Sequence, residues 1–449
     1  MKHILFLIAL WPSILLAQNT IKGTFSPAKD YNFALLYKVT PTISDYVSNA
    51  ELQEDGSFEF KLDSTNTKGM YRLVYAVPQE DYNFDIIYDG KEDIELTFNS
   101  ETGVEFKKST ENKLLASYTN SMSMVTQSIG NYFSQESKDT TALKTIFKTQ
   151  RETQENFEKV AKDSRALEFI KANKPYIPEE VEDVKTYINN LKKHYFDHVN
   201  FNNPILQSSN FLEERMLNYV FGMSSDSKDE LENYKENIDV VYSYMKDAPK
   251  EVQRILLFDL WQQMSDLGFE SIANYIAENY LMDVAVALND QELLHALILC
   301  KNISNGNVAP DFSIEIKEKD KLVEKKLTQL EGAENYIIVF WSSTCSHCLD
   351  EVPQLQTFIK SLEKDKVKVV AIGLEDEPYK WKDLTYSYPE FIHVYGEGKW
   401  DNEIGDAYGV TSTPTYFILD TDKKIISKPV DFDALKKYSR DLTEAARSG

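Results

Sequence analysis

The chain has 449 residues and a mass of 51.8 kDa, a length that predicts two to four domains at roughly 100 to 200 residues per domain. Hydrophobic residues make up 42% of the sequence and aromatic residues 12%, a composition that can bury substantial cores and excludes a disordered or collagen-like chain. The 72 acidic residues outnumber the 49 basic ones and give a net charge of −23. Because this charge repels phosphate backbones, we expect no nucleic acid partner.

Residues 1–17 have the pattern of an export signal. A basic start at Lys2 precedes the apolar run Ile4–Leu16, and Ala17 supplies the small residue of a cleavage site. The run is shorter than the roughly 20 residues that cross a bilayer, so we expect cleavage after Ala17 rather than a retained anchor. The sequence therefore predicts a mature protein in the periplasm, without stable membrane insertion.

Residues 18–108 have the pattern of a β-rich domain. Short stretches of alternating apolar and polar residues, such as Phe58–Leu62, are separated by turn signals. Asp55-Gly56 and Asp89-Gly90 suit hairpin turns, because glycine adopts positive φ without a steric penalty. We predict an antiparallel β-sandwich here, with a small barrel as the alternative.

Residues 109–304 change to a helical period, as in Val184, Ile188 and Leu191, with charged residues between the apolar ones. This pattern predicts a helical middle domain. His194 and His198 share one helical face at a spacing that can bind zinc, but the sequence offers no evident third ligand. We expect no metal and no other cofactor.

Residues 305–446 alternate strands with helices, which predicts a C-terminal α/β domain. The apolar segment Ile337–Trp341 is typical of a buried strand, and a helix is expected from Cys345 to about Leu362. A later hairpin is expected around Asp420–Asp422. The predicted fold class is thus a multidomain chain of β-sandwich, helical domain and α/β domain.

The chain has three cysteines, which are too few for the disulfide scaffold of an exported protein. Cys345 and Cys348 have the spacing C-x-x-C, and no second pair supplies the remaining ligands of a zinc site. Redox chemistry is therefore the better interpretation of this pair. Cys300 lies in an apolar helical run, and we expect it to be a buried thiol.

The position of the C-x-x-C pair predicts a reactive dithiol. A helix N-terminus presents unpaired backbone N–H groups and a partial positive charge, which favour the thiolate of Cys345 over its thiol. Both sulfurs fall on one face of the helix, with Cys345 exposed as the nucleophile and Cys348 sheltered. His347, when protonated, stabilises the thiolate further and makes the disulfide form more oxidising.

Four stretches resemble the thioredoxin-fold thiol-disulfide oxidoreductases of the TlpA/ResA type. They are an entry motif at Ala309–Phe312, the active-site stretch Phe340–Cys348, Pro353 in the active-site helix, and Tyr408–Asp420, which resembles the segment with the cis-proline of the family. The domain layout also resembles multidomain thioredoxin-like proteins of Bacteroidetes, in which a β-rich N-terminal domain and helices precede such a module.

The resemblance implies a thioredoxin fold and further site residues. In this fold Trp341, Thr413 and the cis-proline Pro414 would contact the substrate, Thr413 through its backbone groups. Val339 stands where classical thioredoxin has a buried Asp, so the proton of the second thiol must pass to another group. Glu375 and Asp376, which follow the next strand, are the two candidates, and the sequence does not choose between them.

Taken with the resemblance, these patterns predict an exported thiol-disulfide oxidoreductase that reduces protein disulfides through Cys345 and Cys348. Its expected partners are protein disulfide substrates and an upstream membrane electron donor that restores the dithiol. Two alternatives stay open. One is a disulfide oxidase or isomerase of the same fold, and the other is a periplasmic binding or assembly protein whose thioredoxin module only docks a partner.

Overall fold

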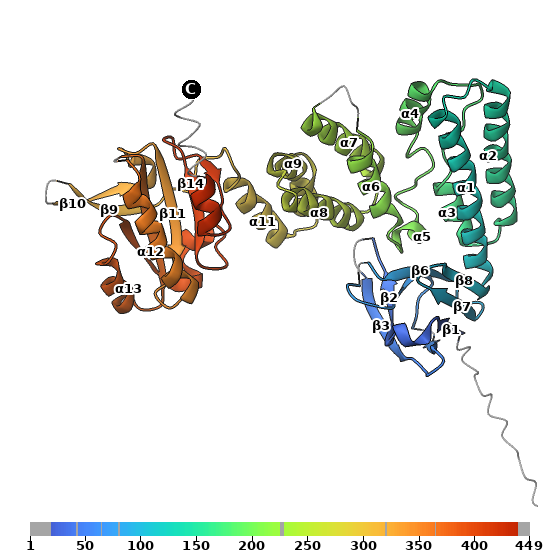
Figure 1. Cartoon of the computed structure of the whole chain (residues 1–449), viewed down its shortest axis with the longest axis horizontal. Coiled ribbons are helices and arrows are strands. Elements are labelled where there is room, and N and C mark those ends of the chain that lie inside the picture. Colours follow the sequence, from blue (N-terminus) through green and yellow to red (C-terminus); the bar gives the residue numbers. More distant parts are fainter. Residues whose placement is uncertain are drawn as a thin grey trace, which may run out of the picture. The chain divides into compact units, whose positions relative to one another are not determined.

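The structure is a computed structural model that describes residues 19–41, 44–63, 65–79, 81–224, 229–318, 321–363 and 365–438. The predicted export signal at residues 1–17 lies outside these ranges. Two compact units are present, Met1–Leu260 and Trp261–Gly449, and many of their elements are labelled in Figure 1. Within the described ranges, none of the helices combines the length and apolar character that a membrane span requires.

The first unit begins with a β-sandwich of two four-stranded sheets. One sheet has the order β4-β1-β7-β8, formed by Ser57–Leu62, Asn19–Phe25, Ile94–Asn99 and Gly103–Lys108. The other has the order β3-β2-β5-β6, formed by Ser44–Glu51, Phe33–Val39, Gly69–Val74 and Asn83–Tyr88. Strand β1 pairs with β7 in parallel, so the first sheet is mixed rather than purely antiparallel. A short 3-10 turn, η1, lies at Ala28–Asp30.

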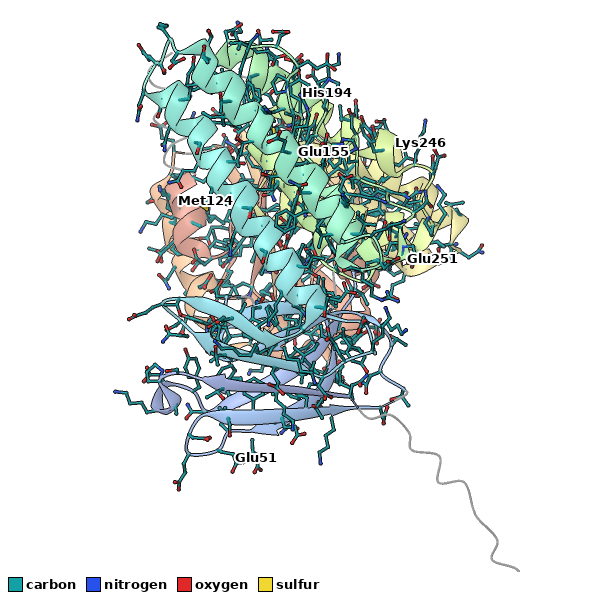
Figure 2. All side chains as sticks on the ribbon, turned by 90° about the vertical axis from the view of Figure 1, so that its right-hand side faces the viewer. Glu51, Met124, Glu155, His194, Lys246 and Glu251 are labelled. Carbon is teal, nitrogen blue, oxygen red and sulfur yellow. The ribbon has the colours of Figure 1, made fainter. Side chains whose placement is uncertain are left out.

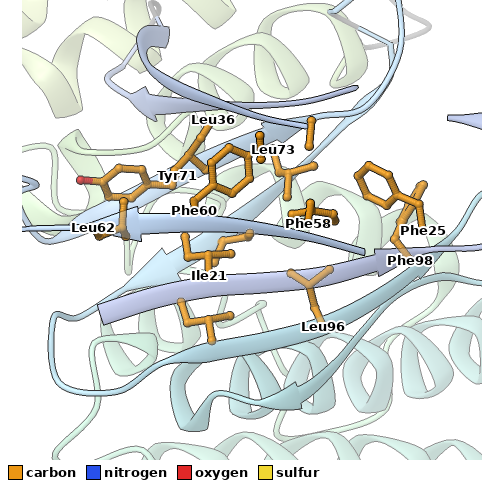
Figure 3. Close-up of a cluster of buried hydrophobic side chains, with 14 of the residues drawn as sticks. Ile21, Phe25, Leu36, Phe58, Phe60, Leu62, Tyr71, Leu73, Leu96 and Phe98 are labelled. Atoms are coloured by element: carbon orange, nitrogen blue, oxygen red, sulfur yellow. The ribbon is translucent and has the colours of Figure 1, made fainter. Parts of the chain in front are cut away.

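Alternation along each strand builds the core of the sandwich. In β4, Phe58, Phe60 and Leu62 are buried while Glu59 and Lys61 are exposed, because successive side chains of a strand point to opposite faces. Side chains from both sheets meet in one apolar cluster, in which Ile21, Leu36 and Leu73 have no solvent exposure. Figure 3 shows this cluster. The predicted β-sandwich is therefore confirmed.

Helices form the rest of the first unit. They are α1 Thr110–Ser134, α2 Thr140–Val160, α3 Ala166–Ala172, α4 Val184–Lys193, α5 Pro204–Gln207, α6 Phe211–Gly222, α7 Glu230–Met245 and α8 Lys250–Asp266, the last of which continues into the second unit. Figure 2 shows α1 and α2 side by side, with the exposed Met124 on the outer side of α1. Asp139 and Asp183 accept hydrogen bonds from the amides of the second and third residues of α2 and α4 and so fix where these helices begin.

One side chain joins α1 to the sandwich. The buried Asn112 donates from Nδ2 to the carbonyl oxygen of Ile87 at 2.8 Å and accepts from the amide of Ile87 at 2.7 Å. Ile87 lies in β6, at the edge of its sheet. The amide of Asn112 thus occupies the positions that the backbone of a further strand would take.

The second unit starts with the helices α9 Glu270–Ile276, α10 Met282–Ala287 and α11 Gln291–Asn302, with a π-helical turn, η2, at Ala277–Leu281. A hairpin of β9 Ser313–Glu318 and β10 Lys321–Lys326 follows, and then a 3-10 turn, η3, at Leu327–Gln329. The five-stranded sheet that comes next has the order β13-β12-β11-β14-β15.

The five strands of this sheet are β11 Asn335–Trp341, β12 Val367–Glu375, β13 Ile392–Glu397, β14 Thr415–Leu419 and β15 Ile425–Ser427. The helices between them are α12 Ser346–Ser361, α13 Pro378–Thr385, η4 Lys399–Asp401 and α14 Glu403–Ala407. Strand β11 is parallel to β12 and antiparallel to β14. Its residues from Tyr336 to Trp341 are all buried, because separate apolar clusters cover both faces of the sheet.

The described residues confirm the predicted fold class of N-terminal sheets, helical middle region and C-terminal α/β domain. The domain limits expected at residues 108, 304 and 446 stay predictions. By spatial contact, α9 to α11 belong to the same compact unit as the C-terminal sheet.

Candidate active site

The C-x-x-C pair lies where the central strand ends and α12 begins. Cys345 is the N-cap residue of α12, and its sulfur accepts a hydrogen bond from the amide of Cys348 at 3.2 Å. This amide is one of those that no carbonyl of the helix can satisfy. The sulfur of Cys345 is therefore held at the positive end of the helix dipole.

The loop before β14 supplies a second contact to Cys345. The thiol lies 3.2 Å from the carbonyl oxygen of Thr413, to which it donates. The peptide bond between Thr413 and Pro414 is cis, and both residues are half-buried. Thr415 pairs with Phe340 across the sheet, and this pairing brings the loop to the end of β11 where the cysteines lie.

The two thiols differ in their surroundings. Cys345 is half-exposed, whereas Cys348 has no solvent exposure, and neither forms a disulfide. Burial raises the pKa of Cys348 to about 12, and the hydrogen bond with Cys345 acts in the same direction. Cys348 therefore keeps its proton at neutral pH, so a group that accepts the proton is needed before this sulfur can attack.

Of the two carboxylates predicted for proton transfer, Glu375 lies against the active-site turn. Its side chain is 4% exposed and accepts hydrogen bonds from the amide and the hydroxyl of Ser343, the latter at 3.1 Å. Asp376 is exposed and lies 3.7 Å from the ammonium of Lys399. The two neighbours thus have separate surroundings, and only Glu375 is tied to the turn that precedes Cys345.

A third carboxylate, Glu351, was missed by the sequence reasoning. It lies three residues after Cys348 in α12, and its Oε2 accepts from the hydroxyl of Tyr416 at 2.9 Å and from the amide of Phe432 at 3.1 Å. Tyr416 is 1% exposed. The i, i+3 spacing, which puts Glu351 on the same side of the helix as Cys348, was the signal in the sequence that could have found it.

The remaining predicted site residues lie on and beneath the surface. His347 is exposed in the first turn of α12. Trp341 has no solvent exposure and packs edge-on against Tyr388, with ring centroids 6.0 Å apart. In this conformation Trp341 lies beneath the surface of the site, and contact with a substrate would require this side chain to move.

The two histidines of the helical region lie in the other compact unit. His194 is hydrogen-bonded to Asp197 at 2.7 Å and stacks on Tyr176. It lines a polar pocket together with Glu155 and His198, and Figure 2 labels His194 and Glu155. Across the ranges the structure describes, no three His, Cys, Asp or Glu side chains are grouped as metal ligands would be.

Comparison with known proteins finds similarity in the C-terminal part of the chain. Residues 333–425 match a family described as thioredoxin-like. A thiol-disulfide oxidoreductase ResA of Oceanobacillus iheyensis is 27% identical over 147 residues, which cover 30% of this chain and 72% of that protein. The protein of the same name from Bacillus subtilis is 25% identical over 126 residues, covering 28% of this chain and 67% of its own length.

Two solved structures are among those similar to this chain. The thioredoxin domain of a thiol-disulfide oxidoreductase from Bacteroides vulgatus is 19% identical, with a TM-score of 0.27, and the match covers 31% of this chain and 96% of that domain. A thioredoxin-like protein from Bacteroides caccae is 18% identical, with a TM-score of 0.30, and the match covers 59% of this chain and 96% of that one.

Proposed function

We propose that this chain, a thiol-disulfide oxidoreductase with a TlpA/ResA-like thioredoxin fold, reduces protein disulfides outside the cytoplasm through Cys345 and Cys348. The observation that carries the proposal is the hydrogen bond from the Cys348 amide to the Cys345 sulfur at the start of α12. This contact places the sulfur at the positive end of the helix dipole, and the thiolate is the form of a cysteine that attacks a disulfide. The predicted export signal supports action in the periplasm.

The reaction has two exchange steps. The Cys345 thiolate attacks one sulfur of a substrate disulfide, forms a mixed disulfide and releases the other substrate sulfur as a thiolate. Cys348 then attacks the sulfur of Cys345, which releases the second substrate thiolate and leaves a disulfide between the two cysteines. An upstream membrane electron donor is then needed to return both cysteines to thiols.

The loop around Pro414 is the proposed binding site for the substrate backbone. The carbonyl oxygen of Thr413 already accepts a hydrogen bond from the thiol of Cys345, so a peptide pairing with this group would have its disulfide next to the nucleophile. Backbone pairing makes little demand on side chains, which suits an enzyme with several protein substrates.

Three carboxylates contribute differently to the proposed mechanism. Glu375 positions the active-site turn through Ser343, and Asp376 adds negative charge near Lys399 at the surface. Glu351 is the carboxylate that we propose as the acceptor of the Cys348 proton, because it lies one turn further along the same helix and is partly open to solvent.

Substitution of each cysteine tests the proposed function. Cys345→Ser is expected to abolish the reduction of insulin disulfides, because no nucleophile remains, whereas Cys348→Ser is expected to accumulate mixed disulfides with substrate. Cys300→Ser provides a matched control with unchanged activity, because Cys300 lies in α11 and burial raises its pKa. Full activity in the Cys345→Ser protein would refute the assignment of the nucleophile.

His347 favours a second candidate function, that of a disulfide oxidase or isomerase. His347 stands between the cysteines in the sequence, and a protonated imidazole near a thiolate makes the disulfide form more oxidising. Equilibration with glutathione buffers measures the reduction potential of the pair. A potential more negative than that of glutathione supports a reductase, and a less negative one supports an oxidase or isomerase.

A further inference from the structure

We propose that Tyr416 links the Cys348 thiol to the Glu351 carboxylate and passes on the proton that Cys348 loses when it attacks the mixed disulfide. The inference rests on the proposed role of Cys348 as the thiol that resolves this intermediate. The group proposed for this transfer is the buried hydroxyl of Tyr416 in β14, the strand next to β11.

The fold fixes Tyr416 next to the cysteines. Tyr416 lies in β14 two residues after Pro414, and it pairs with Val339 in β11. Its side chain is 1% exposed and belongs to the same buried cluster as Cys348. Val339, where classical thioredoxin has an acid, contributes no polar atom, and the hydroxyl of Tyr416 supplies a polar group on the neighbouring strand instead.

The hydroxyl of Tyr416 has one donor and two acceptor positions. The donor is used toward Oε2 of Glu351 at 2.9 Å. The oxygen can therefore accept the proton of a neighbouring thiol while it gives its own proton to Glu351. A hydroxyl in this arrangement transfers a proton without becoming charged at any stage.

Charge interactions support the same arrangement. Burial raises the pKa of Tyr416, and Glu351, Cys348 and Asp431 add to this effect. Glu351 and Cys348 belong to α12, and Asp431 to the segment after β15. Cys348 and Tyr416 share one buried cluster, and the hydroxyl of Tyr416 is bonded to Glu351, three residues after Cys348 in α12, so the hydroxyl lies on the side of the helix that carries the Cys348 thiol.

Glu351 is the group from which the proton can pass to solvent. Its Oε2 is held in place by both Tyr416 and the amide of Phe432. The side chain is only partly buried, so a proton that arrives from Tyr416 can leave to water.

The step balances without a further reactant. The S–H bond of Cys348 breaks, its proton moves to the oxygen of Tyr416, and the hydroxyl proton of Tyr416 moves to Glu351. The Cys348 sulfur forms a bond with the sulfur of Cys345, and the bond between Cys345 and the substrate sulfur breaks. The substrate is reduced and leaves as a thiolate, while the two cysteines are oxidised to a disulfide.

A two-stage reaction with the aromatic disulfide 5,5′-dithiobis(2-nitrobenzoate) separates the two thiols. Attack by Cys345 releases the first coloured thiolate, and attack by Cys348 on the mixed disulfide releases the second. All proteins carry Cys300→Ser, so that no third thiol reacts. Tyr416→Phe is compared with Tyr408→Phe, which removes a buried hydroxyl of the same domain that donates to Pro310 at 2.7 Å.

Tyr416→Phe is expected to leave the first release unchanged and to slow the second by roughly 100-fold at neutral pH, the range of a lost proton-transfer group. The deficit should shrink as the pH rises, because hydroxide replaces the missing acceptor. Glu351→Gln is expected to reproduce this pH profile with Tyr416 intact, and the double variant should be no slower than either single one.

The outcomes distinguish this inference from the proposed function. A second release in Tyr416→Phe that is as fast as in Tyr408→Phe, with the same pH profile, would overturn the role of Tyr416 and leave the dithiol mechanism standing. Loss of the first release in the parent protein would instead remove the proposed function. Glu351→Gln keeps the test valid if Tyr416→Phe does not fold.

Discussion

Cys345 and Cys348 are three residues apart, yet the chain gives them opposite environments. Cys345 precedes the helix and is half-exposed, with its sulfur between the Cys348 amide and the Thr413 carbonyl oxygen. Cys348 is inside the first turn and faces the apolar cluster between sheet and helix. One sulfur is thereby accessible from solvent, while the other is enclosed by the protein.

The raised pKa of Cys348 predicts that the reduced protein loses stability at alkaline pH. Below about pH 9 the thiol is protonated in both the folded and the unfolded state, and its contribution to stability is fully present. As the pH rises toward 12 only the unfolded state loses this proton, so the free energy of unfolding falls by up to roughly 4 kcal/mol.

Urea unfolding under reducing conditions, from pH 8 to pH 11, measures this effect. Other residues also titrate in this range, so wild type is compared with Cys348→Ala at each pH. The difference in unfolding free energy between the two proteins should decrease as the pH rises. Parallel curves would show that Cys348 ionises as readily in the folded as in the unfolded protein.

Local spacing predicted the position of the cysteines but not the carboxylate that we propose for proton transfer. The apolar segment before Cys345 and the helix after it are properties of neighbouring residues. Glu351 meets Tyr416 only because β14 lies beside β11, a contact between residues 65 positions apart. Glu375 and Asp376 are adjacent in sequence, and only the structure separates the buried side chain from the exposed one.

At the scale of elements, the spacing of apolar residues predicted which segments form strands and which form helices. It did not predict which strands pair with one another. Alternating residues identify β4 as a strand with one buried face, yet the same alternation does not tell which strands will be neighbours. The parallel pairing of β1 with β7 joins segments separated by most of the sandwich. Nothing in the sequence of either strand predicts this pairing.

Asn112→Ala is expected to destabilise the first unit by about 2 to 3 kcal/mol. The substitution leaves both the amide and the carbonyl oxygen of Ile87 without their partner in a buried site, and each unsatisfied group costs about 1 to 3 kcal/mol. Asn120→Ala, at an exposed position of the same helix, is expected to change stability by less than about 0.5 kcal/mol. Urea unfolding followed by circular dichroism measures both, and equal effects would contradict the bridging role of Asn112.

At the scale of the molecule, the chain consists of two units with separate apolar cores. The change from strand to helix period predicts that the sandwich ends near residue 108, a limit that stays a prediction. It could not assign α9 to α11 to one unit or the other, because a helical period indicates a buried face and not the surface that buries it.

Separate cores predict unfolding in two transitions. The tryptophans of the described residues, Trp261, Trp341, Trp381 and Trp400, all lie in the second unit, so tryptophan fluorescence reports on that unit while circular dichroism reports on both. The two probes are expected to give different midpoints. Asn112→Ala should move the transition seen by circular dichroism and leave the fluorescence midpoint unchanged, whereas a common shift would indicate a single cooperative unit.

Strand β6 ends its sheet, and an end strand with free backbone groups recruits strands from other molecules. Because the Asn112 side chain occupies both backbone groups of Ile87, a second copy of the protein finds no hydrogen-bonding pair at this residue. The amide that joins α1 to the sandwich therefore also removes one pair of backbone groups of this edge strand from pairing with another molecule.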